Sequence, residues 1–234
     1  TARAFAQKEL APIAAGLESD NAPLSHDMVK RMAELGFLGI NIPEELGGLG
    51  LSNLDALIVL EELAKVSSAV AFPAFEANVG PVHAIRHFAP DALKQRIVPA
   101  VCRGEMILAV SMSEPNAGTA LTDLTTRGRI DGDAVTLNGT KRWCSGGGHS
   151  DAYLVYTRLS DAPGAKGVGA VLVEKGTPGL TFGEPETLMG FRGVPSADLY
   201  LDNVRVPVGN IVVPAGGFAK LMEAFDLERC GNAT

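Results

Sequence analysis

The sequence predicts an α+β protein whose three parts follow one another along the chain. Residues 1–106 show helical periodicity, residues 107–214 change to short apolar runs separated by turn residues, and residues 215–234 return to a helical pattern. We therefore expect an N-terminal all-α helical domain, a middle β-domain of barrel or sandwich type, and the first helix of a C-terminal helical bundle.

The helices of the first part are indicated by apolar residues at three- and four-residue intervals, first over 5–17 and again over 28–38. Ser52 and Asp55 then have the spacing of a capping box ahead of another apolar stretch. The segment 42–50 between these helices contains Pro and three glycines, which predicts an irregular loop.

The middle part has the signature of short strands joined by turns. Asp131-Gly132-Asp133 and Asn138-Gly139 are typical hairpin-turn sequences, so the strand before Asp131 is expected to return toward Trp143. The predicted strands span residues 108–112, 126–130, 135–137, 153–156, 168–173 and 199–206.

The last part reads as one amphipathic helix that begins near Gly216, with Phe218, Leu221 and Phe225 on its apolar stripe. The sequence stops at Thr234 without a further element. We expect the chain to be cut short of a complete helical bundle.

Composition narrows the functional classes. The chain has 234 residues, 46% of them hydrophobic, and a net charge of -7 without a dense run of Lys or Arg, which argues against nucleic-acid binding. No apolar run approaches the roughly 20 residues that span a bilayer, and the first residues lack a signal-peptide pattern. We expect a protein of the cytoplasm without a membrane span.

Cysteine and histidine usage predicts neither a disulfide framework nor a metal site. Cys102, Cys144 and Cys230 are far apart, odd in number and form no CxxC pair, which fits a reducing compartment. His83 and His87 have the i, i+4 spacing of metal ligands, but no acidic residue lies between them and no further ligand cluster follows. They are predicted to be ordinary helix histidines.

Two segments carry the functional signal. Val110-Ser111-Met112-Ser113-Glu114-Pro115-Asn116-Ala117-Gly118-Thr119 ends an apolar strand with hydroxyls, a turn and a glycine. Lys141-Arg142-Trp143-Cys144-Ser145-Gly146-Gly147 adds an aromatic face, another hydroxyl and more glycine. Glycine lets a backbone approach a ligand closely, while hydroxyls and free N–H groups hold carbonyls and phosphates. Each segment alone is an ordinary turn or core aromatic, but the combination suits a flavin.

These segments resemble the flavin-binding signature of the acyl-CoA dehydrogenase family, which reads approximately Thr-Glu-Pro-x-Ala-Gly-Ser-Asp and, downstream, Trp-Ile-Thr. The counterparts here are 113–120 and 143–145, with Ala120 in place of the usual Asp. The likeness extends to Thr234, and family members continue into a C-terminal helical bundle. The resemblance implies FAD as cofactor and assigns it to Val110, Ser111, Met112, Ser113, Gly118, Thr119, Trp143, Cys144 and Ser145.

The resemblance also implies the reaction: removal of hydrogens from the α and β carbons of an acyl-CoA thioester, which gives the trans-2-enoyl-CoA. Some branches of the family place the catalytic glutamate on the helix after the β-domain, directly before an arginine, and this chain has Glu228-Arg229 there. Glu228 is therefore the candidate base. The alternative is a structural helix glutamate paired with Arg229. Thr119, Asp226 and Arg229 match substrate-pocket positions.

The partners implied by the resemblance are the acyl-CoA substrate, an electron-transfer flavoprotein, and further copies of the chain in a tetramer or dimer. In a eukaryote the expected location becomes the mitochondrial matrix. Two other functions remain open from the sequence: a flavin-dependent oxidase or monooxygenase on the same scaffold, and a catalytically inactive module that binds flavin or acyl-CoA.

Overall fold

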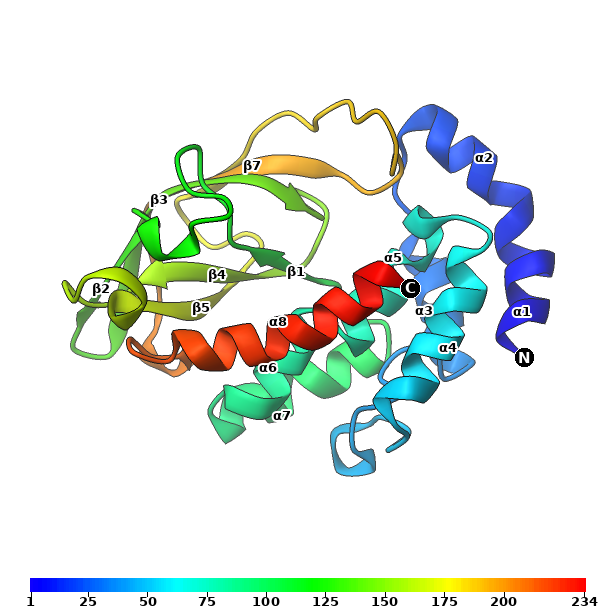
Figure 1. Ribbon diagram of the computed structural model, residues 1–234, viewed down its shortest axis with the longest axis horizontal. Helices are drawn as coiled ribbons and strands as arrows, with labels where there is room; N and C mark the ends of the chain where they lie inside the picture. The colour runs from blue at the N-terminus through cyan, green and yellow to red at the C-terminus, as the bar shows by residue number, and fades with distance from the viewer.

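The computed structural model describes residues 1–234 and places a helical layer beside a mixed β-sheet, with the last helix lying across both (Figure 1). This order of helices, strands and final helix confirms the predicted fold class. The helices are α1 (Ala2–Phe5), α2 (Ala11–Asp20), α3 (His26–Glu34), α4 (Asn53–Ala64), α5 (Ser68–Asn78), α6 (Pro81–Phe88), α7 (Asp91–Cys102) and α8 (Phe218–Ala233). The strands are β1 (Leu108–Ser111), β2 (Arg127–Asp131), β3 (Ala134–Ser145), β4 (Ala152–Arg158), β5 (Val168–Glu174), β6 (Leu180–Phe182), β7 (Ser196–Pro207) and β8 (Ile211–Val213).

Local sequence signals set several helix ends. A π-helical turn, Ala6–Leu10, joins α1 to α2. The predicted capping box is present at the start of α4, where the Asp55 N–H donates to the Ser52 hydroxyl and the Ser52 N–H donates to the Asp55 carboxylate. At α3 the Ser25 hydroxyl accepts from the N–H of Met28. These caps satisfy N–H groups that have no partner within the helix.

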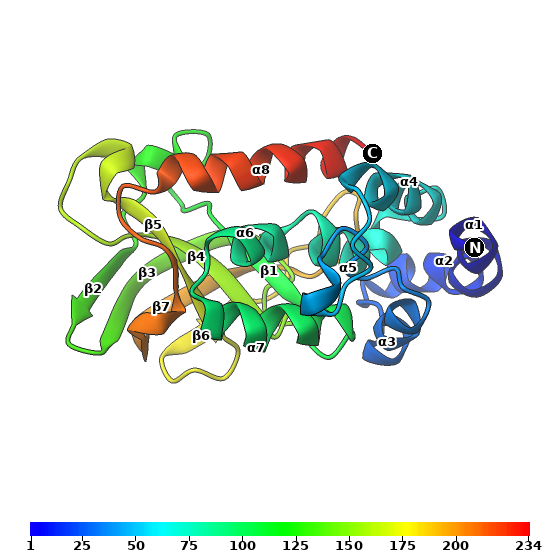
Figure 2. The ribbon, with the colours of Figure 1, turned by 90° about the horizontal axis from the view of Figure 1, so that it is seen from below.

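The sheet has the strand order β6-β7-β3-β2-β4-β5-β8, and β1 pairs in parallel with β4. Alternate residues of β4 face opposite sides: Leu154 and Tyr156 belong to the larger core shared with the helices, whereas Tyr153 and Val155 belong to a smaller core within the strands. Helices α6 and α8 lie against the first side (Figure 2). The sheet is therefore covered by helices on one face and closed by its own strands on the other.

One predicted turn is wrong. Gly132 and Asp133 do connect β2 to β3 as expected, but Asn138-Gly139 lies inside β3, which continues to Ser145. The pairing of β3 with β7 shifts register between Leu137 and Gly139, so the dipeptide forms a bulge instead of a hairpin turn. A Cβ on Gly139 would lie 2.5 Å from Oγ1 of Thr126, so the close packing at this point requires glycine.

Helix α8 approaches α5 closely because Gly231 has no side chain. A Cβ there would lie 2.5 Å from Cγ2 of Val79 and 3.0 Å from the ring of Phe75. This contact holds the end of α8 against the buried helix α5, and it closes the space that contains the site described below.

Replacement of Gly231 by Ala should destabilise the protein by about 1–3 kcal/mol, because the added methyl group overpacks the α5–α8 contact. The matched control is Gly16→Ala in α2, where no atom lies within 4 Å of the added Cβ. That control should stabilise by up to about 1 kcal/mol through helix propensity. Urea denaturation measures both, and equal effects of the two substitutions would contradict the close contact.

Candidate functional site

The turn after β1 leaves backbone donors free beside a tightly bonded loop. The Glu114 N–H donates to the Ala117 carbonyl at 2.8 Å, and Ala117 returns the bond at 3.2 Å. By contrast, the N–H groups of Met112 and Ser113 take no part in the backbone hydrogen bonds around the turn. These two donors lie where the strand ends and the cavity described below begins.

A buried ion pair joins this turn to β3. The Nζ atom of Lys141 lies 2.9 Å from Oε1 of Glu114 and also donates to the Met112 carbonyl at 3.0 Å. The other bonds to the Glu114 carboxylate come from the Thr125 N–H and hydroxyl, both at 2.7 Å, and from the Thr126 N–H at 2.9 Å. The side chains of Lys141 and Glu114 are 0% and 2% exposed, so water does not screen the pair.

The pKa values of the pair reflect this burial. Burial by itself opposes ionisation of Glu114, but the Lys141 ammonium and the hydrogen bonds from Thr126 and Thr125 outweigh it and lower the pKa of the carboxyl to about 2. Burial lowers the pKa of Lys141 to about 8, against the opposing effect of Glu114. Both groups are therefore charged at neutral pH, and each depends on the other.

A β-bulge then aims Trp143 away from the core. Lys141 pairs with Leu199 and Cys144 with Ala197, so Arg142 and Trp143 both face Asp198. Trp143 has a left-handed backbone (φ 55°), and its N–H donates to Oδ1 of Asp198 at 3.3 Å. The indole is 57% exposed, with the Arg142 guanidinium 4.9 Å from its ring centre. A large aromatic face is thus held open to solvent, which is unusual for the single Trp of a chain.

The two segments singled out in the sequence lie side by side. The Arg142 N–H donates to the Ser113 carbonyl at 2.8 Å, and the Cys144 thiol donates to the Val110 carbonyl at 3.3 Å. Between them and helices α5 and α8 lies a cavity of about 180 Å³. Its lining comprises Phe72, Phe75, Glu76, Val110, Met112, Ser113, Arg142, Trp143, Cys144, Ser145, Phe191, Glu228, Arg229 and Asn232.

Glu228 reaches this cavity from the inward face of α8. The residue is 9% exposed, whereas its neighbour Arg229 is exposed and stacks its guanidinium 4.7 Å from the ring centre of Phe225. Burial raises the pKa of Glu228 to about 7, and the Arg229 charge opposes that rise. No ion pair joins Glu228 to Arg229. A carboxyl with a pKa near neutrality in a cleft is a candidate acid or base.

Glu76 is a second buried carboxyl in the same cavity, and the sequence analysis missed it. It is 3% exposed, and its Oε2 atom has no hydrogen-bond partner. Burial, and then the charge of Glu228, raise its pKa well above the usual value. The signal in the sequence was available: Glu76 is the one charged residue in the mostly apolar segment 68–81.

The structure brings most of the predicted site residues together. Val110, Met112, Ser113, Trp143, Cys144, Ser145, Glu228 and Arg229 all line the cavity. Ser111 is buried behind the strand, and the Cys144 thiol points into the core, so Cys144 can contact a ligand through its backbone. Gly118 and Thr119 lie on the exposed turn outside the cavity, and Asp226 is exposed on α8 outside it.

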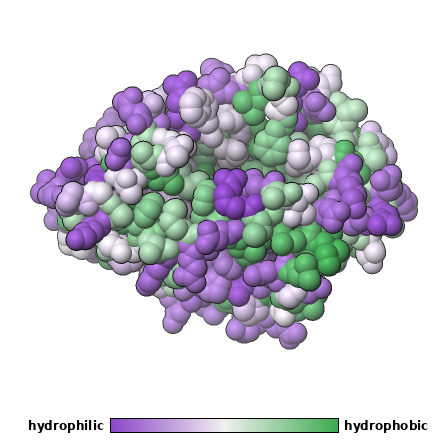
Figure 3. Space-filling model, in the orientation of Figure 1, coloured by the Kyte–Doolittle hydropathy of each residue, from purple (hydrophilic) through white to green (hydrophobic).

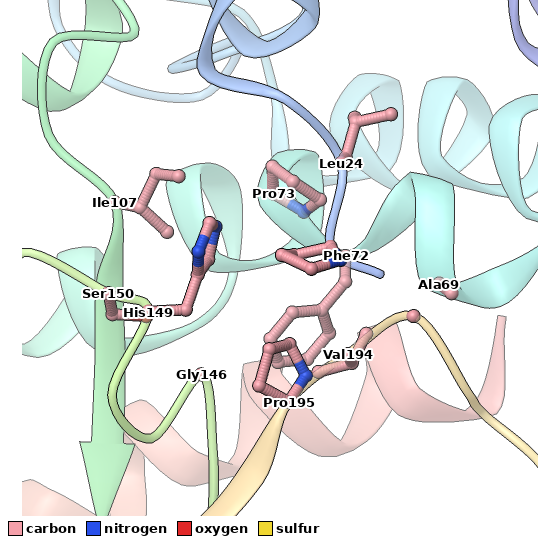
Figure 4. A pocket seen from close by; sticks show the side chains of 12 residues that line it. Leu24, Ala69, Phe72, Pro73, Ile107, Gly146, His149, Ser150, Val194 and Pro195 are labelled. Carbon is pink, nitrogen blue, oxygen red and sulfur yellow. The ribbon is translucent and has the colours of Figure 1, made fainter. Parts of the chain in front are cut away.

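The residues present fit a flavin ring. The exposed indole of Trp143 offers a flat apolar surface, and the free N–H groups of Met112 and Ser113 can donate to ring carbonyls or nitrogens. Ser145, from β3, and Ser113 add hydroxyls at the cavity wall. Phe72 also lines another cavity of about 20 Å³, together with Gly146 and Val194 (Figure 4). That second space is too small for more than a water molecule.

Comparison with known proteins decides the family. The model for the N-terminal domain of acyl-CoA dehydrogenases matches residues 1–105, and the model for the middle domain of the same family matches residues 109–204. The chain belongs to the acyl-CoA dehydrogenase family. The predicted family resemblance is thereby confirmed.

Three similar proteins illustrate the range of this family. The chain is 37% identical over 224 residues to isobutyryl-CoA dehydrogenase of Dictyostelium discoideum, which covers 95% of this chain and 53% of that protein. It is 35% identical to 3-sulfinopropanoyl-CoA desulfinase of Variovorax paradoxus, with 100% of this chain and 60% of that protein covered. The butyryl-CoA dehydrogenase structure from Megasphaera elsdenii superposes with a TM-score of 0.92 at 29% identity, over 99% of this chain and 62% of that one.

This member of the family spans about half to three fifths of the length of the relatives that it matches. The structure contains no helix with the length and hydrophobicity that a membrane span requires. No group of three or more His, Cys, Asp or Glu side chains is arranged to hold a metal ion.

Replacement of Lys141 by Met should lower the free energy of unfolding by about 3–5 kcal/mol, because it leaves the Glu114 carboxylate buried without its counter-ion. Adding Glu114→Gln to this variant should recover part of the loss. The control Arg103→Met breaks an exposed pair with Glu105 and should change stability little. Chemical denaturation at pH 7 compares the four proteins, and a Lys141→Met variant as stable as the control would refute the role of the pair.

Proposed function

We propose that the protein containing this chain is an FAD-dependent dehydrogenase that converts a saturated acyl-CoA to its trans-2-enoyl-CoA. The observation that carries the proposal is the position of Glu228, a buried carboxyl in the same cavity as Ser113, Trp143 and Ser145. A proton acceptor and a flavin-compatible surface are the two parts that α,β-dehydrogenation requires.

The bound flavin would accept the hydride from the β carbon, and the chain's own residues would do the rest. Glu228 takes the α-proton onto a carboxylate oxygen, for which a pKa of about 7 is well matched to neutral pH. The N–H groups of Met112 and Ser113 and the Ser145 hydroxyl orient the ring by hydrogen bonds. Trp143 covers one side of the site and limits the access of water.

The predicted site residues outside the flavin-ring region are proposed to contact the phosphates of the cofactor and the CoA portion of the substrate. Gly118 and Thr119, on the exposed turn, are proposed to approach the cofactor phosphates and the CoA portion of the substrate. Arg229 lies at the cavity wall, where its charge can attract a CoA phosphate, and Asp226 is placed one turn of α8 away from it. An aromatic wall for the acyl chain is formed by Phe72, Phe75 and Phe191. The rings of Phe72 and Phe75 are stacked, with their centres 5.6 Å apart.

Glu228→Gln in the full protein should slow the bleaching of the flavin by acyl-CoA about 10²–10⁴-fold, because the amide cannot accept the α-proton. Anaerobic stopped-flow with a panel of straight and branched acyl-CoA thioesters measures this loss. Glu223→Gln, on the exposed side of the same helix, is the matched control and should retain the wild-type rate.

The pH dependence tests the same assignment. The base works when it is deprotonated, so the wild-type rate should rise with pH through about 7 and then level off. Because the folded pKa is raised, the stability contribution of protonated Glu228 is complete below its usual value of 4.5 and is lost as pH rises through 7. A Glu228→Gln variant whose flavin is bleached at the wild-type rate would show that another carboxylate is the base.

The electrons are proposed to pass to an electron-transfer flavoprotein, and the chain has a surface suited to a protein partner. Leu49, Leu51, Leu54 and Ile58 are exposed large apolar residues on α4 and the loop before it. Figure 3, in the orientation of Figure 1, shows a hydrophobic patch bordered by hydrophilic side chains in the region of α4. Exposed apolar patches of this kind mark protein contact sites.

Ile58→Glu should slow reoxidation of the reduced protein by an electron-transfer flavoprotein about tenfold, the factor that corresponds to 1.4 kcal/mol of lost contact. Bleaching by acyl-CoA should be unchanged because α4 takes no part in the chemistry. Ile130→Glu, an exposed isoleucine on β2, is the control. Rapid reoxidation of the wild type by oxygen alone would instead identify an oxidase.

A further inference from the structure

The buried carboxyl of Glu76 has no partner within the protein, in contrast to its neighbour on the same helix. Asn78 is fully bonded: its Oδ1 accepts from the Ile40 N–H at 2.6 Å, and its Nδ2 donates to the carbonyls of Phe37 and Ala74 at 2.9 and 2.7 Å. Glu76 Oε2 is buried and accepts no hydrogen bond. An unpaired buried polar group is costly, so natural proteins rarely retain one without a function.

The fold makes room for this carboxyl. Gly80, the residue before α6, has no side chain, and a Cβ there would lie 2.4 Å from Oε2 and 3.2 Å from Cδ of Glu76. Any larger residue at position 80 would displace the carboxyl group. The niche at Gly80 therefore accommodates Glu76 in an otherwise apolar part of the helical layer.

Glu76 and Glu228 line one cavity but come from opposite walls, α5 and α8. On the far side of Glu76 lies a space of about 10 Å³ among Leu38, Val101 and Ile107, which is at the lower limit for one water molecule. The carboxyl thus lies where the cavity ends against the core. Phe72 and Phe75, on the same helix as Glu76, supply apolar walls.

We propose that Glu76 forms the polar end of the acyl-binding cavity and recognises a hydroxyl group on the distal part of the acyl chain. This proposal rests on the proposed acyl-CoA dehydrogenation and specifies its substrate class as a short hydroxyacyl-CoA. A hydroxyl both donates and accepts, so it satisfies a carboxyl in either protonation state. Because burial favours the neutral form of Glu76, a cationic group on the ligand is not required.

The hydroxyl must lie beyond the reacting carbons. A group on the α or β carbon would meet Glu228 and the flavin surface, whereas the end of a short acyl chain meets the innermost wall. The aliphatic part between them packs on the phenylalanine wall. Recognition of the hydroxyl would then give the hydroxyacyl-CoA a higher kcat/KM than the unsubstituted acyl-CoA. The reason is that a site built to bond a hydroxyl leaves a polar group unpaired when the hydroxyl is missing.

The test compares 4-hydroxybutyryl-, 5-hydroxyvaleryl- and 6-hydroxyhexanoyl-CoA with their unsubstituted counterparts in the full FAD-loaded protein. The wild type should prefer one hydroxyacyl-CoA by at least about tenfold in kcat/KM. Glu76→Leu should reverse this preference, while Glu76→Gln, which retains donor and acceptor atoms, should keep most of it. Glu76→Leu is expected to fold, because it replaces an unpaired polar group by an apolar one of similar size.

Each outcome decides the proposal. Turnover of unsubstituted acyl-CoA with no preference for a hydroxyl, or a preference that Glu76→Leu leaves unchanged, overturns the role of Glu76 and leaves the proposed dehydrogenation intact. An absence of flavin bleaching by every thioester overturns both. A crystal structure of the wild-type complex in which a water molecule, and not the ligand, is hydrogen-bonded to Oε2 of Glu76 would also overturn the proposed role of Glu76.

Discussion

The buried ion pair between Glu114 and Lys141 is the constraint on which the site depends. Glu114 belongs to the turn after β1, and Lys141 belongs to β3, two strands that do not pair with each other in the sheet. The pair and its bond to the Met112 carbonyl fix the end of β1 against the middle of β3. Because Trp143 follows Lys141 by two residues and Ser113 precedes Glu114 by one, the same contact sets the position of both relative to the cavity.

The wall of the cavity opposite Trp143 and Ser113 is held in place by a different contact, the packing of α8 on the helical layer. Gly231 lets α8 pack on Val79 and Phe75 of the helical layer, and this approach buries Glu228 together with Glu76. Two carboxyls in one apolar space are unfavourable for folding, since burial disfavours the ionisation of both and the charge of Glu228 adds to this effect at Glu76. Their retention is understandable if each has a task with a bound ligand, one as proton acceptor and the other as a hydrogen-bonding group.

Local sequence patterns were sufficient to predict the element types, the capping box at Ser52 and the turn at Gly132. They failed at Asn138-Gly139, because the preference of this dipeptide for a turn is local whereas its place inside β3 is set by pairing with β7. The same limit explains why the orientation of Trp143 was not predictable: it depends on Asp198, a residue 55 positions away.

The site residues show a similar division. Family resemblance pointed to Ser113, Trp143, Ser145 and Glu228, which the fold does bring into one cavity. Glu and Lys are residue types that usually lie at the surface. Only the fold shows that Glu114 and Lys141 are buried and paired. Glu76 was detectable as a lone charge in an apolar helix, but no local pattern could show that its partner is missing.

A crystal structure of the full protein with FAD and a non-reactive acyl-CoA analogue tests the central claim most directly. The flavin ring should lie against Trp143 and the Ser113 N–H, with a Glu228 oxygen about 3–3.5 Å from the α carbon of the acyl group. A flavin bound elsewhere, or a different carboxylate at the α carbon with Glu228 turned away, would contradict it.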